Sequence, residues 1–137
     1  MAEKDTAGTG TTAEGNLDRL LGDLRALTGD IESCAVLSGE GELLSSSHGP
    51  GVERDRVTAM LGALAGLAAR AAREKGHERP AQVKVSTEAG HLLMVSLADG
   101  ATLVATTAAE ARSGLVLYDM RNARSEIEKA IGGGKRS

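Results

Sequence analysis

The sequence predicts an α+β domain with the element order αββαβββα. Amphipathic helical runs lie near both ends of the chain, and a long Ala/Leu-rich run lies in the middle. Five β-prone runs are placed between them, separated by glycine-containing turns. With 137 residues, the chain has the length of one domain with one core. We expect a five-stranded, mainly antiparallel sheet, with the long central helix on one face and the N- and C-terminal helices on the other.

The first predicted element is a short amphipathic helix over about 16–28. It begins at Asn16, a favourable N-cap residue, and ends at Thr28-Gly29-Asp30. Its leucines recur at helical spacing: Leu17, Leu20, Leu21, Leu24 and Leu27. The Thr/Gly/Ala-rich segment 1–13 and the Gly-rich segment 132–137 are predicted to be flexible tails of a domain that covers 14–131.

A β-hairpin is predicted after this helix. The segment from Ile31 to Ser38 is β-prone, Gly39-Glu40-Gly41 forms a tight turn, and Glu42 to Ser46 returns. We expect Gly41 to be required for the turn. The stretch SSSHGPG, residues Ser45 to Gly51, is then predicted to break regular structure before the central helix.

Three further strands and a last helix complete the fold. The strands are expected over 82–87, 91–97 and 101–107, with Ala89-Gly90 and Asp99-Gly100 as hairpin turns, so Gly100 is a second structural glycine. The last helix begins near Ala109. Its apolar residues form one stripe: Val116, Met120, Ala123, Ile127 and Ile131.

Composition excludes several classes of function. The chain has no Phe or Trp and one Tyr, against 18 Gly, so it lacks the aromatic rings on which single-stranded nucleic acids stack. The formal net charge of −3 gives no basic surface for duplex DNA. A lone Cys34 cannot form an internal disulfide, and the first residues lack the apolar core of a signal peptide. We therefore expect a soluble cytoplasmic protein.

The central helix is the longest element, from Val52 to about Lys75, or on the order of 35 Å. Its uncharged part, Val57 to Ala69, is shorter than the roughly 20 residues that span a bilayer, so no membrane span is expected. At 100° per residue one face collects large residues, namely Val57, Met60, Leu61, Leu64, Leu67 and Ala68. The opposite face collects small ones, namely Ala59, Gly62, Ala63, Gly66 and Ala69.

The small-residue face predicts a partner surface. A sheet covers one side of a helix, and each of Gly62 and Gly66 costs roughly 1 kcal/mol relative to Ala, a cost that close approach of another backbone would offset. Charged residues at both helix ends fit the rim of an antiparallel helix pair. The alternative is that Ala and Gly here simply tolerate solvent. The predicted interface residues are Ala59, Met60, Gly62, Ala63, Gly66, Leu67, Arg70, Val83 and Val85.

The last two of these residues belong to the strand Gln82 to Thr87, which alternates apolar and polar side chains. At a sheet edge, this strand could pair with its own copy and extend the sheet across a dimer. The alternative is an ordinary half-exposed strand on which Lys84 discourages aggregation. The pattern alone leaves both open.

No catalytic, metal or cofactor site is predicted. His48, His77 and His91 lack metal-ligand spacing. Ser46-Ser47-His48 contains a hydroxyl and an imidazole but no nucleophile elbow. Cys34 lies in an apolar strand, which predicts a small buried hydrophobe. The terminal Gly132 to Ser137 lacks the first glycine of a phosphate loop and the helix that would follow it.

Two segments resemble the roadblock (dynein light chain) domain family in its bacterial branch. Cys34-Ala35-Val36-Leu37-Ser38-Gly39-Glu40-Gly41-Glu42-Leu43-Leu44 is similar to that family's first hairpin. Ser113-Gly114-Leu115-Val116-Leu117-Tyr118-Asp119-Met120-Arg121 is similar to its final helix. The resemblance implies a non-catalytic homodimer that regulates or scaffolds a small Ras-like GTPase. It also implies that the central helices and third strands form the dimer, and that Gly114 lets the last helix lie close to the sheet.

Two other functions stay open from the sequence. A small-ligand sensor of similar α+β layout would need a lined, concave pocket, which the shortage of aromatic residues disfavours. A small hydrolase would depend on Ser46, Ser47 and His48 alone.

Overall fold

The computed structural model describes residues 9–74 and 81–136. Its elements follow the predicted order. They are α2 (Thr9–Thr28), β1 (Ile31–Leu37), β2 (Leu43–His48), α3 (Arg54–Glu74), β3 (Gln82–Ser86), β4 (His91–Ser96), a 3₁₀ turn (Ala98–Gly100), β5 (Thr102–Thr107) and α4 (Ser113–Arg136).

The five strands form one sheet in the order β2-β1-β5-β4-β3, with every neighbouring pair antiparallel. The chain is therefore α+β, as predicted. β1 and β5 lie in the interior of the sheet, and β5 is buried along its whole length. β2 and β3 lie at the two edges, with a register shift where β1 passes from Val36 to Leu37.

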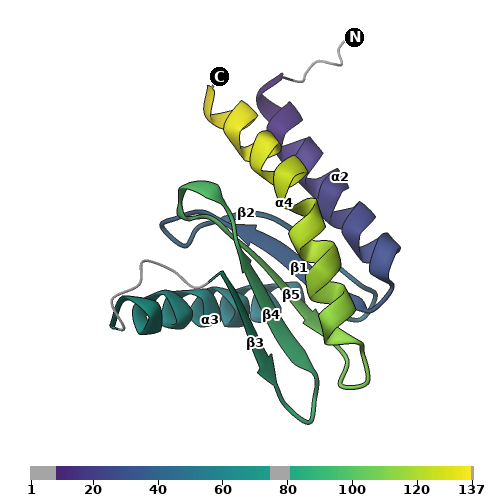
Figure 1. Cartoon of the computed structure of the whole chain (residues 1–137). Coiled ribbons are helices and arrows are strands. Elements are labelled where there is room, and N and C mark those ends of the chain that lie inside the picture. Colours follow the sequence, from purple (N-terminus) through teal and green to yellow (C-terminus); the bar gives the residue numbers. More distant parts are fainter. Residues whose placement is uncertain (1–8, 75–80, 137) are drawn as a thin grey trace.

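Helices cover both faces of the sheet (Figure 1). α2 and α4 lie side by side and antiparallel on one face, where the larger core cluster includes Leu21, Cys34, Leu103 and Met120. α3 lies on the other face, where Leu61 packs with a smaller cluster from β1, β4 and β5. The predicted distribution of helices is confirmed.

The first helix begins at Thr9 rather than at Asn16, so Asn16 is not its N-cap. The additional turns contain Thr and Gly, which are weak helix formers. α2 lies beside α4 (Figure 1), and tertiary contacts rather than propensity supply most of a helix's stability. The helix ends as predicted: Gly29 has φ 71°, and its N–H donates to the carbonyl of Arg25 at 3.0 Å.

The last helix also differs from its predicted limits. It begins at Ser113, four residues after Ala109, and continues through the Gly run to Arg136. Helical turns thus extend into both segments predicted to be tails, and residues 1–8 and 137 lie outside the described residues. The flexibility of the tails and the domain limits of 14–131 stay predictions.

The β4–β5 turn is built on two residues with positive φ. Asp99 has φ 60° and Gly100 has φ 81°, and the Ala101 N–H donates to the Ala98 carbonyl at 3.2 Å. A two-residue hairpin turn with positive φ at both central residues matches the twist of the flanking strands. Asp-Gly favours this conformation, and this is why the pair predicted the turn. In the first hairpin, Gly41 has φ 87° and its N–H donates to the Ser38 carbonyl.

The β3–β4 turn lies one residue earlier than predicted. Thr87 and Gly90 pair with each other, so Glu88 and Ala89 are the turn residues and Gly90 is the residue that follows. Gly90 has φ 152°, and a Cβ placed on it would lie 2.0 Å from the carbonyl oxygen of Thr107. Gly90 is therefore required by a close backbone approach that the sequence did not reveal.

Candidate functional site

The candidate site is the outward face of α3 together with the edge strand β3. α3 packs on the sheet through few residues. Leu61 is fully buried, while Val57 and Leu64, one turn before and after it, are half-buried. The main contacts of α3 are with β1, β2 and β5, so α3 covers one part of its face of the sheet.

The outward face of α3 includes large residues as well as small ones. Met60 and Leu67, which helical spacing places on the large-residue face and which are among the predicted interface residues, are 45% and 59% exposed. They share the exposed face with small residues, because the narrow contact with the sheet leaves both flanks of the helix uncovered. We call this face the α3 stripe, and it comprises Ala59, Met60, Ala63, Gly66, Leu67 and Arg70.

The glycines of α3 have no packing role among the described residues. A Cβ on Gly62 or Gly66 would meet no described atom within 4 Å. Gly66 is exposed and Gly62 half-buried. Their cost in helix stability, roughly 1 kcal/mol each, is therefore not offset by a contact in the described part of the chain.

The strand β3 lies at the sheet edge, where it pairs with β4. Val83 is half-buried against the Leu61 cluster, and Val85 is 36% exposed. Lys84 points to the other face, where its ammonium donates to the Ser113 hydroxyl at 3.1 Å. The predicted residues Val83 and Val85 thus lie on the same face of the sheet as α3.

Gly114 does not have the role that the family resemblance implied. It is exposed, and an added Cβ would meet no described atom within 4 Å. α4 is held on the sheet by Val116, Leu117 and Met120, which are buried. Tyr118 is 54% exposed on the outer side of this helix.

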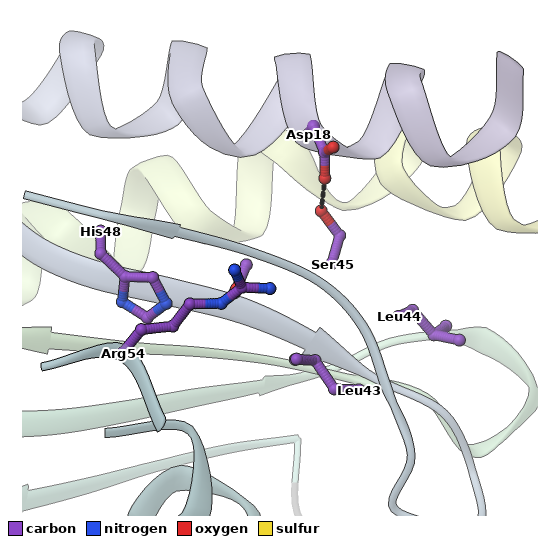
Figure 2. A pocket seen from close by; sticks show the side chains of 7 residues that line it. Asp18, Leu43, Leu44, Ser45, His48 and Arg54 are labelled. Atoms are coloured by element: carbon purple, nitrogen blue, oxygen red, sulfur yellow. Dashed lines mark hydrogen bonds between the residues drawn. The ribbon is translucent and has the colours of Figure 1, made fainter. Parts of the chain in front are cut away.

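A polar cavity of about 350 Å³ lies at the opposite edge of the sheet. Figure 2 shows side chains from α2, β2 and the start of α3 around it. The lining residues are Asp18, Leu43, Leu44, Ser45, Ser46, His48 and Arg54. The sequence patterns did not indicate this cavity, because its walls come from segments far apart in the chain.

Ser45 and Ser47, two of the serines near His48, form hydrogen bonds to other residues. The Ser45 hydroxyl donates to the Asp18 carboxylate, and the Ser47 hydroxyl accepts from Nε of Arg25 at 2.8 Å. The Nδ1 atom of His48 lies 3.0 Å from Oγ of Ser33, a serine that is fully buried and so closed to substrate. This geometry speaks against the hydrolase alternative.

Two titratable side chains among the described residues have shifted pKa values. Burial raises the pKa of the Cys34 thiol to about 12, against a smaller opposing effect of Arg25. Its sulfur lies 3.7 Å from the Leu21 carbonyl oxygen, so the predicted role as a buried hydrophobe is confirmed. Burial, then Arg54 and Arg25, lower the pKa of His48.

Metal-binding and membrane-spanning features are absent from the part of the chain that the structure describes. No group of three or more potential ligands that could hold a metal ion lies within 9–74 and 81–136. Among the helices of these same residues, none is both long and apolar enough to cross a bilayer. His77 lies outside the described residues.

Comparisons with known proteins identify the family. Residues 17–107 match the model of the Roadblock/LC7 domain. An uncharacterised protein of Methanocaldococcus jannaschii is 32% identical over 112 residues, which are 82% of this chain and 96% of that protein. The solved Roadblock/LC7 domain of Streptomyces avermitilis is 30% identical with a TM-score of 0.63, over 81% of this chain and 97% of that one.

A more distant structure shares the fold. The gliding protein MglB of Thermus thermophilus is 16% identical with a TM-score of 0.71, over 86% of this chain and 90% of that one. The family model covers more than half of the chain, and the match to the Methanocaldococcus jannaschii protein covers nearly the whole length of that protein. The resemblance seen in the sequence is confirmed: this chain belongs to the Roadblock/LC7 domain family.

Proposed function

We propose that this chain is a non-catalytic, homodimeric regulatory or scaffold protein that binds a small Ras-like GTPase in the cytoplasm of a bacterium. The observation that carries the dimer is the α3 stripe, which leaves Met60 and Leu67 exposed beside glycines that no described residue approaches. The GTPase partner is supported by membership in the Roadblock/LC7 domain family and by the family properties that the sequence resemblance implies.

In this proposal the α3 stripes of two copies pack together. Gly66 and Ala63 let the two helix backbones approach closely, and the neighbouring Met60 and Leu67 lose their contact with water. Complete burial of such a side chain contributes about 1.5–3 kcal/mol, and these two are partly buried already, so each contributes on the order of 1 kcal/mol.

The β3 edge supports the same self-contact. Its outer backbone groups have no neighbouring strand in the described part of the chain, and Val83 and Val85 lie on the α3 side of the sheet. Pairing of β3 with its own copy would satisfy those backbone groups and continue the apolar surface. Helix packing and strand pairing would thus act together in one two-fold interface.

Light scattering tests the dimer. We expect the wild type to have twice the chain mass of 14.0 kDa, and Gly66→Leu to shift it to the monomer by placing a bulky side chain between the helices. Gly15→Leu is the matched control, because Gly15 is also an exposed helical glycine with open space at its Cβ position. A monomeric wild type, or a dimer unaffected by Gly66→Leu, would refute this interface.

Affinity capture from an extract of the native cell tests the GTPase. We expect tagged wild type to retain a small Ras-like GTPase, and to retain different amounts of it in the presence of GDP and of a non-hydrolysable GTP analogue. Recovery of the dimer without any GTP-binding protein would contradict this part of the proposal and leave the dimer standing.

A further inference from the structure

The cavity at the β2 edge has a lining that the proposed dimer does not use. It lies on the side of the sheet remote from β3, because β2 and β3 are the two edge strands. One wall is α2, the base is β2, and the start of α3 closes the other side (Figure 2). Its volume of about 350 Å³ falls at the lower end of small-ligand pockets.

Hydrogen-bond donors dominate one end of this cavity. The Arg54 guanidinium projects into the space between His48 and Leu43 in the view of Figure 2. A guanidinium carries five donors and no acceptor, and Arg54 is an exposed residue that lines the cavity. The Nε2 atom of His48 is buried without a partner among the described residues, because Ser33 occupies only Nδ1.

The edge strand adds backbone donors and acceptors to the same end. The Gly49 N–H donates to the Glu32 carbonyl of β1 at 2.8 Å. Because backbone groups alternate sides along a strand, the N–H and C=O groups of Ser46 and His48 both face away from β1. Both residues line the cavity.

The acidic acceptor of the lining is already hydrogen-bonded. Asp18 is the one acidic residue of the lining, and its carboxylate already accepts the Ser45 hydroxyl. A second cation, Arg25, lies near His48 and donates to Ser47. Two arginines therefore lie near one imidazole, and the lining contains one carboxylate.

We propose that the cavity at the β2 edge binds a small oxyanion, a carboxylate or a phosphate group, with Arg54 as its main ligand and His48 and Ser46 beside it. A planar guanidinium matches the oxygens of either group with two parallel hydrogen bonds. The proposal is independent of the dimer and of the GTPase, because none of its residues belongs to the α3 stripe or to β3.

NMR of the histidine side chains tests this site on the full-length chain. Acetate and inorganic phosphate are titrated separately to tens of millimolar, with sodium chloride holding the ionic strength constant. We expect a saturable shift of the His48 imidazole signals, assigned with His48→Asn, and no shift of His91. A response to acetate alone assigns a carboxylate, and a response to phosphate alone assigns a phosphate group.

Two variants are expected to change the anion affinity in opposite directions. Arg54→Gln should weaken binding at least tenfold, because it removes the charged donor. Asp18→Asn should tighten it, because it removes the competing negative charge but keeps an oxygen for Ser45. Arg124→Gln, at an exposed arginine on α4, should change nothing. No saturable shift with either anion, equal affinity in Arg54→Gln, or weaker binding in Asp18→Asn would overturn the site.

Discussion

Glycines in this protein differ in how closely other backbone atoms approach them. Among the glycines that the structure describes, Gly90 has the closest backbone approach: its φ is 152°, and an added Cβ would lie only 2.0 Å from the Thr107 carbonyl oxygen. Gly15, in the exposed part of α2, meets nothing. The fold thus requires glycine at position 90 but not at position 15, and composition alone does not distinguish the two positions.

We expect Gly90→Ala to lower the free energy of unfolding by about 2–4 kcal/mol, because the methyl group collides with backbone between two paired strands. Gly15→Ala should raise it by roughly 0.5–1 kcal/mol, because alanine is the better helix former. Urea denaturation followed by circular dichroism measures both. Equal stabilities for Gly90→Ala and wild type would show that the close approach to Thr107 is absent.

His48 gives the fold a pH dependence of defined sign. Its pKa is lowered in the folded state by burial, Arg54 and Arg25, so the unfolded chain binds the proton more readily. Stability therefore rises with pH where the two states differ in bound protons, and is lost on acidification below the ordinary histidine pKa of about 6.5.

We expect the urea midpoint of the wild type to fall between pH 7.5 and pH 5.5 by more than that of His48→Asn. The comparison removes the contribution of the other titrating groups, which both proteins share. A piperazine or bis-tris buffer avoids the oxyanions proposed as ligands. Parallel pH profiles for the two proteins would mean that the His48 pKa is not shifted by folding.

At the scale of elements, one face of α3 packs on the sheet and the opposite face is exposed. Positions 57, 61 and 64 face the sheet, while positions 59, 60, 63, 66, 67 and 70 form the outward stripe. In an antiparallel pair with its two-fold axis at Ala63, Met60 lies opposite Gly66 and Leu67 opposite Ala59. Large side chains then meet small ones, which is the arrangement that close helix packing requires.

We expect Ala63→Cys to form a disulfide-linked dimer under mild oxidation, because residues facing each other across such an axis come within disulfide reach. The native Cys34 does not interfere, since its thiol is buried. Ala26→Cys, at an exposed alanine of α2, serves as the control and should remain unlinked. Non-reducing electrophoresis reads out the result. If Ala63→Cys is a dimer by light scattering yet forms no cross-link, the axis lies elsewhere on α3.

The limits of the terminal helices show what a local pattern can miss. Asn16 marks a good N-cap in sequence, yet it lies inside α2, because α2 continues beside α4. That partnership joins segments about a hundred positions apart in the chain, so no window of sequence contains it. The strands were easier, since the β-prone runs and the Asp99-Gly100 turn are local signals.

At the scale of the whole molecule, the sheet has two open edges with different chemistry. β3 presents Val83 and Val85 toward the α3 side, whereas β2 presents serines, His48 and a polar cavity. A dimer built through β3 would leave the two β2 edges at the far ends of a continuous sheet. Self-contact and ligand binding could then occur on one molecule without competition.

The sequence by itself determined the order of elements, the antiparallel sheet and the choice of α3 as the candidate interaction helix. These follow from hydrophobic periodicity and turn chemistry, which act over a few residues. The tertiary structure decided which side chains of α3 are covered, that Gly90 rather than Gly114 is closely approached, and that Asp18, His48 and Arg54 share one cavity. Those facts depend on contacts between distant segments, and only the folded chain brings such segments together.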